Sequence, residues 1–73
     1  MNKNEIKRLL KDAKAEAVKQ NATDKPFICQ YLNDTADSIC RDLNYLNMRD
    51  EMTEKRMKEL QEFAHDYAAD LQP

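Results

Sequence analysis

The chain has 73 residues, of which 36% are charged and 41% are hydrophobic, and its net charge at pH 7 is −2. This length allows one domain with a small core, which argues against an enzyme built around a deep pocket. The slightly negative charge argues against a general nucleic-acid-binding protein. The chain contains no glycine, so tight hairpin turns, phosphate-binding loops and nucleophile elbows are not expected. The composition therefore favours an all-α fold.

A first helix is expected from about residue 3 to residue 20. Apolar side chains recur there at the spacing of one helix face, and Lys and Arg fill much of the remaining surface. Either Asn2 or Asn4 can cap its start. Residues 1–25 carry a charge of +3, so this helix is basic. The expected core positions are Ile6, Leu9, Leu10, Ala13, Ala17 and Val18.

Residues 21–25 form the clearest connector, because Asn, Thr and Asp side chains compete with a helix for backbone hydrogen bonds. Thr23 or Asp24 is expected to cap a second helix that runs from about residue 26 to residue 46, with a proline in its first turn. Its apolar residues step by three and four, which predicts a central helix with a continuous seam. The seam contains Ile28, Leu32, Ile39, Leu43 and Leu46, and Phe27 and Tyr31 form an i,i+4 pair beside it.

A third helix is expected from about residue 50 to residue 71. The break before it is weaker, because it contains neither Gly nor Pro, so the second and third helices could also be continuous. Asn47 with Asp50, or Thr53, could cap the third helix. Its seam includes Leu60 and Tyr67. An acidic row, formed by Glu59, Glu62, Asp66 and Asp70, follows the same helix.

These elements predict a three-helix arrangement in which the second and third helices form an antiparallel hairpin and the first helix packs across it. Five aromatic side chains exceed what so thin a core needs. We therefore expect a homodimer, formed through the second helix and in part the third. The residues expected to supply the core and dimer contacts are Ile28, Leu32, Ile39, Leu43, Leu60 and Tyr67.

The two cysteines, Cys29 and Cys40, are eleven residues apart. On one straight helix that spacing gives a rise of about 16 Å, whereas a disulfide needs Cα atoms within about 7 Å. We expect reduced thiols, with a bridge between two chains as the alternative.

No apolar run is long enough to span a membrane or to serve as a signal peptide. The lack of a spanning segment and of a signal-peptide stretch predicts a cytoplasmic protein that does not enter a membrane.

One motif has the spacing of a metal site. Glu62 and His65 form the Glu-x-x-His pair found in carboxylate-bridged di-iron bundles. Such a site needs a second pair and two further acids, which only a dimer using residues such as Asp34 and Asp37 could supply. A surface histidine beside a solvated glutamate is the simpler interpretation. We therefore expect no bound metal and no cofactor.

Nucleophilic catalysis has less support in the sequence. Neither cysteine has His65 as an evident partner, and Ser38, the only serine, is expected within a helix. No glycine-built oxyanion loop is present. We therefore expect no enzyme activity.

The sequence favours a small regulatory protein that presents helix faces to a protein partner. The expected partner-facing residues are the acidic row of the third helix together with Tyr31 and Tyr45. Carboxylates three and four residues apart are about 5–6 Å from each other, close to the spacing of phosphates along a nucleic-acid strand. Such a row could fill a nucleic-acid-binding groove, as short inhibitors encoded by phages and mobile elements do.

Two alternatives remain open. The basic first helix could contact nucleic-acid phosphates through Lys7, Lys11 and Lys14, although these would not read base sequence. The chain could also be a metal-binding dimer that uses Glu62 and His65.

Overall fold

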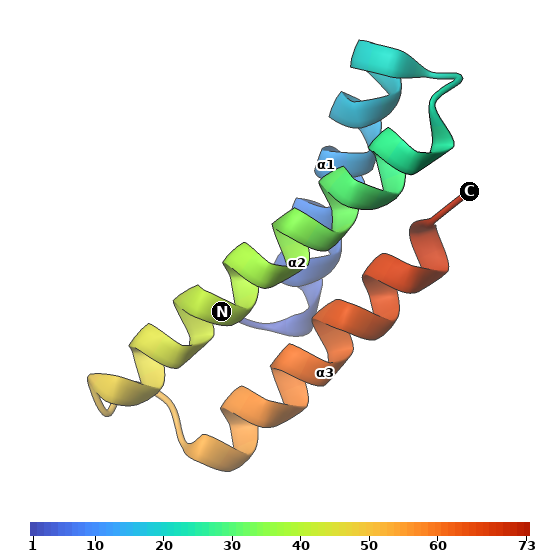
Figure 1. Ribbon diagram of the computed structural model, residues 1–73. Helices are drawn as coiled ribbons and strands as arrows, with labels where there is room; N and C mark the ends of the chain where they lie inside the picture. The colour runs from blue at the N-terminus through green and yellow to red at the C-terminus, as the bar shows by residue number, and fades with distance from the viewer.

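The computed structural model describes all 73 residues as three α-helices. The helices are α1 (Lys3–Asn21), α2 (Lys25–Met48) and α3 (Glu54–Leu71). Both α1 and α3 run antiparallel to α2, and each helix contacts the other two (Figure 1). The bundle is a rod of 42 × 17 × 17 Å. The predicted all-α, three-helix fold is confirmed, and α2 and α3 form the predicted hairpin.

Each helix begins at a side-chain cap that accepts a backbone N–H. The Asn2 side chain accepts from the Glu5 amide at 2.9 Å, and Asp24 accepts from the Phe27 amide at 3.0 Å. Thr53 Oγ1 accepts from the Arg56 amide at 3.2 Å. These bonds satisfy amides that have no partner inside the helix. Each cap is one of the options that the sequence left open.

The turn between α2 and α3 differs from the prediction. Asp50 adopts a left-handed conformation with φ of 57°. Its amide bonds the Asn47 carbonyl, and the Glu51 amide bonds the Leu46 carbonyl. This pair of bonds forms a Schellman motif, with Asp50 at the position that glycine usually takes. It ends α2 and excludes a continuous α2–α3 helix. The predicted start of α3 at residue 50 is wrong, because Asp50 belongs to this motif and α3 begins after Thr53.

The core consists of thirteen buried residues drawn from all three helices. Five of the thirteen are alanines, which lets the helices approach closely and keeps the rod thin. A core made of so many small side chains buries little apolar surface, so we expect a stability of only about 3–5 kcal/mol. Leu9 and Val18, two of the expected core positions, are 38% exposed at the edges of α1.

Candidate functional site

The acidic row on α3 is fully displayed on the surface. Glu59, Glu62, Asp66 and Asp70 are all exposed, and the buried side of α3 is formed by other residues. Glu59 pairs with Arg56 at 3.5 Å within the helix. Glu62, Asp66 and Asp70 have no cation within 4.0 Å, because none of the four ion pairs in the structure includes them. The structure thus leaves three neighbouring carboxylates without a partner.

The two tyrosines expected to face a partner, Tyr31 and Tyr45, lie on α2. Tyr31 is half-buried on α2, where its ring centroid is 6.0 Å from that of Phe27. Tyr45 is 55% exposed, and its hydroxyl accepts a 3.0 Å hydrogen bond from Arg49. The structure does not bring these side chains together with the carboxylates of α3. The acidic row is therefore a surface of its own.

The residues expected to form a core and dimer seam serve the core of the single chain. Ile28, Leu32, Ile39, Leu43 and Leu60 are at most 3% exposed. Tyr67 is half-buried and packs against the edge of that core. A dimer interface would therefore have to use side chains other than these five aliphatic ones.

The basic residues of α1 divide into different environments. The Lys3 and Lys7 ammonium groups lie 5.4 and 5.8 Å from the ring centroids of Phe63 and Tyr67 on α3. These cation–π contacts are worth about 0.5–1 kcal/mol each at exposed sites. Lys11 is exposed and Lys14 is half-buried. No lysine or arginine of α1 takes part in an ion pair.

The contact between α2 and α3 includes a cluster of polar side chains that the sequence did not indicate. Cys40 Sγ lies 3.4 Å from His65 Nε2, and Asp37 Oδ1 lies 4.0 Å from the same nitrogen. The sequence showed His65 as an evident partner of neither cysteine, whereas the structure places it beside Cys40. Cys40 and His65 are 25 residues apart, so only the hairpin brings them together. The register of α2 against α3 would have been needed to predict this contact.

The chemistry of this cluster is that of a structural contact. Burial, and to a smaller extent the Asp37 carboxylate, raises the pKa of the Cys40 thiol above its ordinary value of 9.0. The thiol is therefore protonated at neutral pH and is a poor nucleophile. In a catalytic triad the acid and the nucleophile contact opposite ring nitrogens, whereas Asp37 and Cys40 both approach Nε2.

The contacts of His65 are with residues of α2 rather than with Glu62, the other member of the Glu-x-x-His pair. Its Nε2 is directed toward Cys40 on α2, while Glu62 is exposed on α3. No group of three or more His, Cys, Asp or Glu side chains is placed to hold a metal ion within the chain. Both cysteines are free thiols, and both lie on the uninterrupted helix α2.

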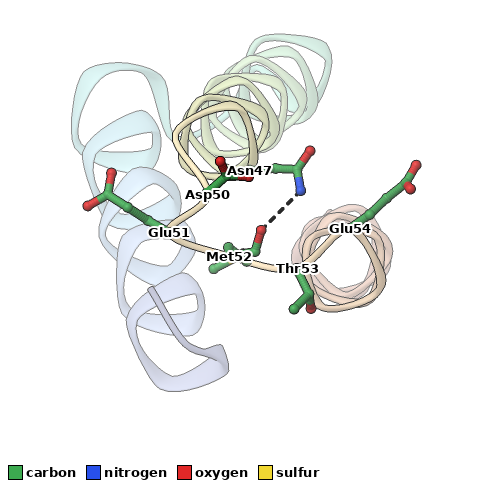
Figure 2. A pocket seen from close by; sticks show the side chains of 6 residues that line it. All are labelled: Asn47, Asp50, Glu51, Met52, Thr53 and Glu54. Carbon is green, nitrogen blue, oxygen red and sulfur yellow. Dashed lines mark hydrogen bonds between the residues drawn. The ribbon is translucent and has the colours of Figure 1, made fainter.

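A shallow hollow lies at the α2–α3 turn. Figure 2 shows its six lining residues, with the Asn47 amide donating a 3.0 Å hydrogen bond to the Met52 carbonyl. The Glu51 and Glu54 side chains point away from each other, and each pairs with a neighbouring cation, Arg49 and Lys58 respectively. These contacts shape the turn and leave no group of side chains converging on a ligand.

Comparisons with protein-family models, with curated proteins and with solved structures found no match for this chain. No helix of the bundle combines the length and the apolar character needed to cross a membrane.

Proposed function

We propose that this chain is a non-catalytic interaction protein that presents the acidic row of α3 to a protein with a basic surface. The observation that carries the proposal is that Glu62, Asp66 and Asp70 are exposed without a cation partner. Exposed acids are common on helices, so a binding role also requires that these charges do not stabilise the fold.

Evidence for this comes from their position on α3. Glu62, Asp66 and Asp70 are spaced four residues apart, and like charges at i,i+4 destabilise a helix by about 0.2–0.5 kcal/mol per pair. Asp70 lies in the last turn of α3, which contains no basic residue. A negative charge there opposes the helix dipole, at a cost of about 0.3–1 kcal/mol at low salt. In a small bundle, charges that weaken the fold point to a role in binding.

The geometry of the row suggests how a partner would be recognised. Asp70 follows Glu62 by eight positions, which is about 12 Å along the helix axis. Carboxylates about 6 Å apart can meet Lys and Arg side chains that are spaced to bind successive phosphates. We propose that the chain inhibits or regulates its partner by covering such a basic groove, through contacts that salt weakens.

The test compares two variants with the same change in charge. One replaces Glu62, Asp66 and Asp70 with Lys, and the other replaces Asp12, Asp34 and Asp42, which are exposed on α1 and α2. Both are used as baits in a native lysate, and captured proteins are identified by mass spectrometry. The proposal expects proteins that bind the wild-type chain and the control but not the α3 variant. Equal capture by all three baits would refute the role of the acidic row.

A second candidate function is nucleic-acid binding through α1. It is favoured by the lysines and arginine of α1, none of which is in an ion pair. It is opposed by the aromatic contacts of Lys3 and Lys7 and by the partial burial of Lys14. Duplex affinity that falls steeply above about 50 mM salt, and falls further when Lys11 is replaced, would support it. No measurable binding at that salt concentration would exclude it.

A further inference from the structure

The first observation concerns the direction and height of two charged rows. Because α1 and α3 both run antiparallel to α2, they run in the same direction (Figure 1). Lys3 covers Phe63 and Lys7 covers Tyr67, so a four-residue step along α1 matches a four-residue step along α3. The two helices are therefore in register where they lie side by side.

The second observation is that charged residues extend the same side of each helix as these contacts. On α1, Lys11 and Lys14 follow Lys7 by four and seven residues, so they extend the same side. On α3, Asp66 and Asp70 follow Phe63 by three and seven residues, and Glu59 precedes it by four. A basic row on α1 and an acidic row on α3 thus run in parallel along one face of the rod.

The third observation is that these rows do not neutralise each other within the chain. No lysine of α1 lies within 4.0 Å of a carboxylate. The Lys3 and Lys7 ammonium groups lie over aromatic rings instead. The face therefore presents two complementary charged strips, both available for contacts outside the chain.

We propose that this face binds a second copy of the chain, related by a two-fold axis parallel to the helices. This inference rests on the proposed function, because it takes the acidic row as the binding surface and names its basic partner. A two-fold axis along the rods places Lys7 and Lys11 of each copy opposite Asp66 and Asp70 of the other at nearly the same height, because Lys7 is level with Tyr67. A two-fold axis across the rods would place α1 against α1 and would oppose like charges.

The size of the face sets the strength of such a contact. Because Lys3 is level with Phe63 and α3 ends at Leu71, α1 and α3 lie side by side over about nine residues, or about 14 Å. This overlap is smaller than a standard interface, to which each partner contributes about 800 Å². The face offers the half-buried rings of Phe63 and Tyr67 and the aliphatic stems of the lysines as its apolar part. Most of the remaining contact is charged, so the dimer should be weak and sensitive to salt.

The experiment is sedimentation velocity on two charge-reversed variants of the full chain. Lys7→Glu with Lys11→Glu places acids opposite Asp66 and Asp70, and Asp66→Lys with Asp70→Lys places lysines opposite Lys7 and Lys11. Each variant alone should be a monomer, because like charges then oppose each other across the interface. Their equimolar mixture should form a heterodimer, because each acidic strip then meets a basic one. The wild-type chain should dimerise at about 50 mM salt and dissociate at about 500 mM.

Two controls keep the outcome decisive. Lys19→Glu with Lys25→Glu makes the same charge change at other exposed positions and should still dimerise. Circular dichroism checks that each variant is helical. If a reversed variant does not fold, two neutral variants replace the pair: Lys7→Gln with Lys11→Gln, and Asp66→Asn with Asp70→Asn. Each should form a weaker dimer than the wild-type chain.

A wild-type chain that is monomeric at about 100 µM and low salt overturns the inference. A dimer that ignores all of these substitutions also overturns it. Either result leaves the proposed function to the lysate experiment, which tests for a different protein on the acidic row. If the mixed dimer forms but the α3 variant captures the same proteins as the wild-type chain, self-association is the only role left for the acidic row.

Discussion

The contact between α2 and α3 differs in kind from the contact between α1 and α3. Side-chain hydrogen bonds join α2 to α3: Gln61 donates to the Cys40 carbonyl and to Asn44, and Gln72 donates to Asn33. No hydrogen bond or ion pair joins α1 to α3, which meet through apolar packing and two lysines over aromatic rings. The first contact uses its polar groups to specify the hairpin. The second leaves the lysines of α1 and the carboxylates of Glu62, Asp66 and Asp70 outside any ion pair.

The largest effect is expected where α1 depends on the shared core. Leu10 is fully buried on α1, while its neighbour Leu9 is 38% exposed. Leu10→Ala should cost about 2–5 kcal/mol, which is comparable to the stability of so small a domain. Leu9→Ala should cost much less. Thermal unfolding followed by circular dichroism measures both. Similar losses at the two sites would show that α1 is not held by its buried stripe.

The next effect tests the polar contact between α2 and α3. The Gln61 side-chain amide bonds two acceptors on α2, at 3.1 and 3.0 Å. Gln61→Ala should cost about 1–2 kcal/mol, because one or both acceptors then lose a partner at the α2–α3 contact. Gln30→Ala is the matched control, because the Gln30 amide bonds only Asp34 on its own exposed helix face. Urea denaturation should separate the two, and equal values would contradict the assigned role of Gln61.

A smaller effect is expected from the cation–π contacts between α1 and α3. Lys7→Met keeps an apolar stem but removes the charge over Tyr67, and should cost about 0.5–1 kcal/mol. Lys11→Met removes the same charge where no ring lies beneath it and should change stability by less. The comparison is made at low protein concentration, where self-association does not contribute. A larger loss from Lys11→Met would mean that charge, rather than ring contact, holds α1 to α3.

The smallest effect concerns the thiol of Cys40 at the α2–α3 contact. Since the pKa of Cys40 is raised in the folded chain, the thiol binds its proton more tightly when folded than when unfolded. Its contribution to stability is therefore complete below the unfolded pKa and is lost as pH rises through the folded pKa, above 9.0. Cys40→Ser should flatten the fall in unfolding free energy above pH 9, and Cys29→Ser should not. Identical pH profiles for both variants would contradict this.

Much of the fold could be predicted from the sequence, because the relevant signals are local. The apolar spacing of α2 identified Ile28, Leu32, Ile39 and Leu43, all of which are buried. The start of α3 was predicted wrongly because Asp50 adopts a left-handed conformation that glycine usually adopts. An aspartate in the sequence does not by itself indicate that conformation.

The candidate site was predictable only in part. Charge spacing found the acidic row, since i,i+4 neighbours always share a helix side. The Cys40–His65 contact depends on the register between two helices, which spacing along one helix does not fix. The parallel basic row of α1 needed both the helix direction and the lysine positions, so only the folded chain revealed it.

The most direct test of the account is the stability of a chain whose acidic row is neutral. Glu62→Gln, Asp66→Asn and Asp70→Asn together remove two like-charge pairs and a charge that opposes the helix dipole. At micromolar concentration and low salt, the account predicts a gain of about 1 kcal/mol, or a rise in Tm of about 4–8 °C. A fall in Tm would show that the row is held by the lysines of its own chain, and would contradict the claim that these charges are kept for binding.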